Sequence, residues 1–159
     1  MKRILCSLFI ICLLCLVSGC GDKQSEIFKS IELDSSKCKI EDSIDSHGGF
    51  HGDGDYFARI KCSGIDSKEL SKNWKKLPLS DSLDKVTEMK QCDDKGCFNI
   101  YDKFSIPVVE NGYYYFIDRQ ADSRNKHDDT DLNNRSSWNF TLAIFDTDTG
   151  IIYYYELDT

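Results

Sequence analysis

The densest group of side chains that could do chemistry lies in residues 47–55, which read HGGFHGDGD. Imidazole is a ligand for zinc and other late transition metals, and carboxylates can complete such a shell. His47, His51 and Asp53 are therefore candidate metal ligands. A His-x-x-x-His pair is most effective on a helix, however, and the four glycines in this segment disfavour a helix. The plainer interpretation is a glycine-rich loop between two strands, with histidines that cap backbone groups.

The second such group lies in residues 118–137, a polar stretch between two strongly apolar segments. Loops of this length in compact domains are usually functional or disordered. Three acids at 128, 129 and 131 suit a cation, but the EF-hand pattern with its closing Glu is absent. We interpret the stretch as a solvated loop, with a binding loop or a cation site as alternatives. Across both groups the candidate ligand-binding residues are His47, Phe50, His51, Asp53, Asp118, Arg119 and His127.

Alternating and helical patterns indicate the elements that must position these residues. Residues 55–62 alternate between two faces and predict a half-buried strand. Asp66 and Glu69 form a capping box, which predicts a helix from Asp66 through Leu77 that Pro78 ends. Residues 79–86 suggest a second short helix.

The C-terminal half reads as β-structure. Residues 106–110 and 113–118 flank Asn111-Gly112, a strong hairpin signal. Residues 138–144 and 151–157 alternate likewise, and 146–150 supplies a turn ending in glycine. We therefore predict an α+β fold: an antiparallel sheet of about five strands with one or two short helices packed on one face.

The cysteines predict disulfides. Cys92 and Cys97 close a short loop with a turn-forming glycine, so they are the natural local pair. Opposed strands around residue 50 would place Cys38 directly across from Cys62, a reachable geometry for a bridge. Free thiols and a zinc site remain alternatives, although paired C-x-x-C units are missing.

The N-terminus has two positive charges and then an apolar run, Ile4 to Val17, too short for the roughly 20 residues that a bilayer span needs. The run ends in LVSGC at Cys20, which resembles a bacterial lipoprotein signal. The resemblance implies that the Cys20 thiol receives a diacylglycerol group and that the chain is cleaved between Gly19 and Cys20. Cys20 then becomes an acylated N-terminus, with palmitate among its acyl chains, that anchors the protein in the membrane. We expect a signal peptide at 1–19, a lipidated N-terminus and tether at 20–36, and one domain at 37–159.

A second resemblance covers most of residues 45–159. The motifs HGGFHGDG (47–54), NGYYYFIDR (111–119) and NFTLAIFDT (139–147) look like those of a group of small bacterial proteins of unassigned function. The resemblance implies one compact domain. It carries no catalytic or binding residue over to this chain.

Composition narrows the function classes. The formal net charge of −7 disfavours binding to a nucleic-acid backbone. No nucleophile elbow, P-loop, dinucleotide fingerprint or HExxH motif is present, so no cofactor is expected. The leading hypothesis is a lipid-anchored, extracytoplasmic, non-enzymatic module that binds an unknown protein or glycan. Alternatives are a metal-assisted hydrolase centred on the His47–Asp55 loop and a protective partner of an exported toxin.

Overall fold

The computed structural model describes residues 22–48, 52–93, 96–121 and 125–159. The chain divides into two compact units, Met1–Ser36 and Lys37–Thr159. In the first unit, Asp22–Ser30 form helix α2. A 3-10 turn, η1, spans the boundary between the units at Ser35–Lys37. Part of the segment expected to be a tether is therefore helical.

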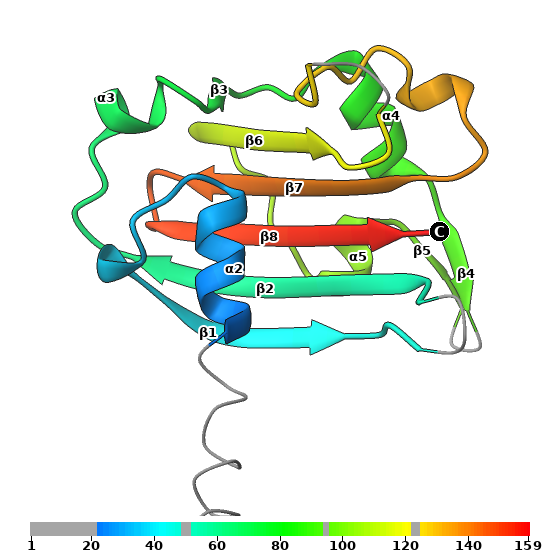
Figure 1. The fold of residues 1–159 in the computed structure, drawn as a ribbon, viewed down its shortest axis with the longest axis horizontal. Coiled ribbons are helices and arrows are strands. Elements are labelled where there is room, and N and C mark those ends of the chain that lie inside the picture. The colour runs from blue at the N-terminus through cyan, green and yellow to red at the C-terminus, as the bar shows by residue number, and fades with distance from the viewer. Residues whose placement is uncertain (1–21, 49–51, 94–95, 122–124) are drawn as a thin grey trace, which may run out of the picture. The chain divides into compact units, whose positions relative to one another are not determined.

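The second unit is built on a six-stranded antiparallel sheet, in the order β1-β2-β8-β7-β6-β3 (Figure 1). In that order the strands are Cys38–Asp45, Gly54–Cys62, Ile151–Asp158, Asn139–Asp146, Gly112–Asp118 and Lys75–Lys76. A two-stranded sheet joins β4 (Gln91–Asp93) to β5 (Gly96–Phe98). The α+β prediction is confirmed, with one strand more than expected.

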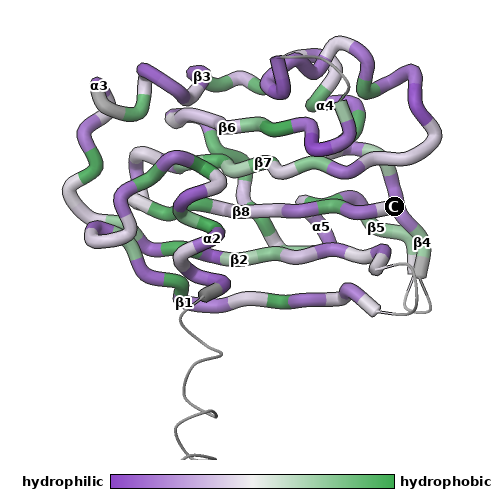
Figure 2. Tube along the Cα trace, in the orientation of Figure 1, coloured by the Kyte–Doolittle hydropathy of each residue, from purple (hydrophilic) through white to green (hydrophobic). Residues whose placement is uncertain are grey.

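Short helices pack on one face of the large sheet. Helix α4 (Asp81–Glu88) contributes Leu83 and Val86 to the core, and α5 (Ile100–Phe104) contributes Ile100. They meet inward residues of the central strands, namely Tyr114, Phe116, Phe140, Leu142, Ile144, Tyr155 and Leu157. The long connection from β6 to β7, which holds the 3-10 turn η2 (Leu132–Asn134), is mainly hydrophilic (Figure 2).

The predicted helix over residues 66–77 is wrong beyond its first turn. Asp66 does cap a helix, since its Oδ1 accepts the Lys68 N–H at 2.9 Å, but α3 spans only Ser67–Leu70. The side chain of Glu69 lies outside what the structure describes. The backbone leaves the helix because β3 pairs with β6 at the sheet edge and Trp74 is buried against the Tyr115 ring. The second predicted helix corresponds to α4.

The hairpin predicted at Asn111-Gly112 is also wrong. Residues 106–110 form no strand, and β6 pairs with β7 instead. Gly112 serves close strand approach, because a Cβ there would lie 2.0 Å from the Phe145 carbonyl oxygen. The β7–β8 turn is confirmed: Gly150 has φ +68°, and its N–H donates to the Asp146 carbonyl at 2.8 Å.

Both predicted disulfides form. Cys38 and Cys62 are direct register partners on β1 and β2 and are bonded to each other. Cys92 and Cys97 bridge the β4–β5 pair. Each bridge closes a loop and so restricts the unfolded chain.

Candidate functional site

His47 lies just after β1, between two carboxylates. Its Nδ1 is 2.7 Å from Asp45 Oδ1, and its Nε2 is 3.1 Å from Asp158 Oδ2. Burial alone would lower the pKa of His47, but hydrogen bonds and charge from both carboxylates outweigh it and raise the pKa above 6.5. Because both ring nitrogens are occupied, His47 serves as a connector between the β1–β2 loop and the end of β8.

Arg119, at the end of β6, reaches the same carboxylate. Its Nη2 donates to Asp158 Oδ1 at 2.6 Å, and its Nη1 donates to Thr141 Oγ1 at 2.6 Å. The Glu156 carboxylate, also on β8, lies 3.4 Å from Arg119 Nη1. The structure thus joins the two regions singled out in the sequence, since Asp158 links His47 to Arg119 at one end of the sheet.

Asp118 and His127 hold the long β6–β7 connection against the sheet. The buried Asp118 accepts both Arg135 Nη groups, at 3.2 and 2.5 Å, and the Gln120 N–H at 3.0 Å. His127 Nδ1 lies 2.8 Å from the Phe116 carbonyl oxygen. These contacts are internal, and they occupy the Asp118 carboxylate and the Nδ1 atom of His127.

The remaining predicted residues do not complete a site. Phe50 and His51 lie outside the described residues, and Asp53 is exposed. Within the described ranges, no group of three or more His, Cys, Asp or Glu side chains is placed to hold a metal ion. The metal site proposed from His47, His51 and Asp53 therefore gains no support from the described residues.

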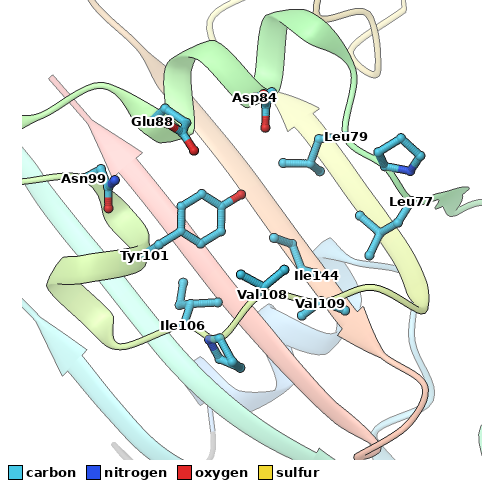
Figure 3. A pocket seen from close by; sticks show the side chains of 12 residues that line it. Leu77, Leu79, Asp84, Glu88, Asn99, Tyr101, Ile106, Val108, Val109 and Ile144 are labelled. Atoms are coloured by element: carbon cyan, nitrogen blue, oxygen red, sulfur yellow. The ribbon is translucent and has the colours of Figure 1, made fainter.

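A different feature, an apolar groove, has the character of a binding site. It has a volume of about 330 Å³ and lies between α4, α5 and residues 106–109 (Figure 3). This size is at the lower end for small-ligand sites, which are concave and mostly apolar. Its walls comprise Leu77, Pro78, Leu79, Asp84, Glu88, Asn99, Tyr101, Ile106, Pro107, Val108, Val109 and Ile144. We call this the α4–α5 groove.

The polar groups of the α4–α5 groove are few. Asp84 and Glu88 point from α4 toward the ring of Tyr101, which stands at the centre of the groove (Figure 3). The Tyr101 hydroxyl donates to Thr87 Oγ1 at 3.4 Å. Burial raises the pKa of Tyr101, and the charges of Asp84 and Glu88 raise it further. The groove thus combines an apolar floor with a negatively charged edge.

Specific caps and contacts fix the walls of the α4–α5 groove. Ser80 Oγ caps α4 by accepting the Leu83 N–H, and Asn99 Oδ1 caps α5 by accepting the Asp102 N–H at 2.8 Å. The Lys103 ammonium pairs with the buried Asp55 carboxylate of β2. Helix α5, which carries Tyr101, is thereby tied to the sheet.

Sequence reasoning missed this groove. Residues 106–109 were assigned to a strand because they are apolar, and Asp84 and Glu88 fall on the polar side of a short helix. The available signal was Pro107, which lacks an N–H and so disfavours a paired strand at that position.

Protein-family models, curated proteins and solved structures give no match to this chain. Over the described ranges, no helix combines the length and apolar character needed to cross a membrane.

Proposed function

We propose that this protein is a lipid-anchored, extracytoplasmic, non-enzymatic binding module whose binding surface is the α4–α5 groove. The observation that carries the proposal is the groove itself: about 330 Å³ of mostly apolar space with a negatively charged edge. Exposed apolar surface beside it strengthens the case, because Val108 is 90% exposed at its rim. Contiguous apolar surface rimmed by polar groups is typical of interaction sites.

The N-terminal sequence supports the location. Two basic residues, an apolar run and the LVSGC sequence at Cys20 fit an acylated anchor in the membrane. The two disulfides fit an oxidising, extracytoplasmic compartment. The partner of the exposed domain is then a protein or glycan outside the cytoplasm.

The polar network is the weaker candidate for binding. Other groups of the chain contact both ring nitrogens of His47, the Asp118 carboxylate and the Arg119 guanidinium. His127 contacts the chain through Nδ1. Such satisfied networks rigidify a fold and leave little capacity for a ligand. No observation on the described residues favours the hydrolase alternative or the toxin-partner alternative.

The anchor is tested by labelling cells with radioactive palmitate. The wild type and a Cys15→Ala control are expected to incorporate label and to sediment with membranes. Cys20→Ala is expected to lose both properties, because acylation needs that thiol. Label retained by Cys20→Ala would overturn the anchor.

The binding surface is tested by photo-crosslinking in cells. The full chain carries benzoylphenylalanine in place of Val108, at the rim of the groove, or in place of Ile44, an exposed apolar residue of β1. Crosslinked adducts are expected from position 108 and not from position 44. Equal crosslinking from both positions, or none from either, would remove the groove as the binding surface.

A further inference from the structure

Two like charges on α4, Asp84 and Glu88, lie beside the α4–α5 groove. Asp84 and Glu88 are one helical turn apart, a spacing at which like charges repel. Glu88 is also in the last turn of α4, where the helix macrodipole favours positive charge. Over the part of the chain that is described, neither carboxylate forms an ion pair. A bound cation would relieve this local cost.

The space next to these carboxylates fits a long basic side chain. Lys and Arg place an apolar stem along apolar surface and keep a charged head in a polar setting. In the α4–α5 groove the apolar surface is formed by Leu79, Ile106 and Val109. The negative charge is carried by Asp84 and Glu88. The Tyr101 ring at the centre adds a face for cation–π contact.

The lower rim of the groove can bond to a peptide backbone. Residues 107–110 form neither helix nor strand, and Pro107 has no N–H to donate. Among the described residues, the main chain of Val108 and Val109 takes part in no hydrogen bond with the rest of the protein. Extended peptides bind to such free main-chain groups, while pockets select their side chains.

From these observations we infer that the α4–α5 groove binds an extended peptide segment in which a Lys or Arg side chain lies beside aliphatic residues. The inference rests on the proposed function and names its ligand class. The basic head pairs with Asp84 and Glu88, its stem lies on Tyr101, and the aliphatic neighbours contact the rim at Val108. Charge supports the same choice, because the whole chain is acidic, with a net charge of −7.

The test is a selection from a random peptide library on the purified full chain, followed by affinity measurements on the selected peptides. The groove variant is Asp84→Asn/Glu88→Gln. Its control is Asp42→Asn/Glu26→Gln, which changes the net charge equally at exposed positions of β1 and α2. A third variant, Val108→Ser, removes the apolar side chain at the rim without adding charge, with Ile44→Ser as its control.

The expected result is enrichment of peptides that carry Lys or Arg next to an aliphatic residue. Their Kd is expected to rise about tenfold or more in the groove variant, as for loss of a charge-assisted hydrogen bond, and less than about twofold in the control. Replacing the basic residue of the peptide by Gln should raise the Kd for the wild-type protein by the same factor, and it should change the Kd for the groove variant little.

Other results would overturn the inference, and they differ in what they leave standing. Peptides that bind without a basic residue, unaffected by the groove variant but weakened by Val108→Ser, would refute the ligand class and keep the groove as the binding surface. Absence of peptide binding, or peptide binding that Val108→Ser leaves unchanged, would also remove the groove as a peptide site. Octylammonium binding without peptide binding would replace the peptide by a small amphiphilic amine.

Discussion

The strongest stability prediction concerns Lys103, which anchors a wall of the α4–α5 groove. Its ammonium pairs with Asp55, whose side chain is only 5% exposed. Asp55 Oδ1 also accepts the Tyr155 hydroxyl at 2.6 Å. Lys103→Met keeps most of the apolar stem and removes the charge, so the Asp55 carboxylate would remain buried with no cation beside it.

The size of the effect follows from this burial. Breaking a buried ion pair by removing one partner costs about 3–5 kcal/mol. Lys103 is 25% exposed and Tyr155 still donates to Asp55, so we expect the low end, about 3 kcal/mol in the free energy of unfolding. With a urea m-value of about 2 kcal/mol/M, the midpoint would fall by about 1.5 M.

The assay is urea unfolding followed by tryptophan fluorescence, since both tryptophans, Trp74 and Trp138, lie in the second unit. The exposed Lys72→Met is the control and should shift the unfolding free energy by less than about 0.5 kcal/mol. Adding Asp55→Asn to Lys103→Met should recover about half of the loss, because the uncompensated charge is gone. Equal midpoints for Lys103→Met and Lys72→Met would refute this reasoning.

Three further predictions use the same unfolding assay. His47→Gln should cost up to about 1 kcal/mol at pH 5.5 and less at pH 8.5. The reason is that the pKa of His47 is raised in the folded protein, so protonated His47 stabilises the fold. This stabilisation is complete below about pH 6.5, and it is lost as the pH rises through the folded-state pKa. A loss of unfolding free energy that does not depend on pH would contradict this explanation. Arg135→Leu should lower the free energy of unfolding by about 3 kcal/mol, because it leaves the buried Asp118 carboxylate without its cation. Arg59→Leu breaks an exposed ion pair and should lower it by less than about 1 kcal/mol. Similar losses for the two variants would show that burial of the pair does not matter. Cys38→Ser/Cys62→Ser should lower the free energy of unfolding by about 3.5 kcal/mol, because the bridge closes a loop between residues 24 positions apart. An unchanged urea midpoint would show that the bridge does not restrict the unfolded chain.

The strands were predictable where the pattern is local. Strands β2, β7 and β8 coincide with local apolar runs in the sequence, and Gly150 ends a turn that neighbouring Asp and Thr residues favour. The half-buried pattern predicted for residues 55–62 is wrong for the first half of β2, because Asp55, Tyr56, Phe57 and Ala58 are all buried. The strand predicted over residues 106–110 does not form: Ile106 is buried in a cluster with Phe57 and Tyr153 without strand pairing, while Val108 is exposed at the rim of the groove. Pattern alone does not separate these two uses of an apolar run.

The site was predictable only in part, for a reason of sequence distance. His47 and Arg119 stood out by residue type, but Asp158, which joins them, lies 111 positions from His47 in the chain. The α4–α5 groove depends on tertiary placement still more. In the sequence, Asp84 and Glu88 look like part of a solvent-exposed helix face. Only the folded structure places Tyr101 and residues 106–109 across the groove from them.

The two kinds of charged group in this domain indicate different roles. Asp55, Asp118 and Asp158 each pair with a cationic side chain, and each pair fixes one segment to the sheet. These pairs spare Asp55 and Asp118 the cost of an uncompensated buried charge, so the structure of the free protein accounts for them. Asp84 lies in the first turn of α4, where the helix macrodipole favours negative charge, but Glu88 lies in the last turn and at a spacing where the two like charges repel. The position of Asp84 and Glu88 beside the groove is explained when a binding partner supplies a positive charge. The Lys103–Asp55 pair then matters for binding, because it holds α5, the opposite wall of the groove, in position.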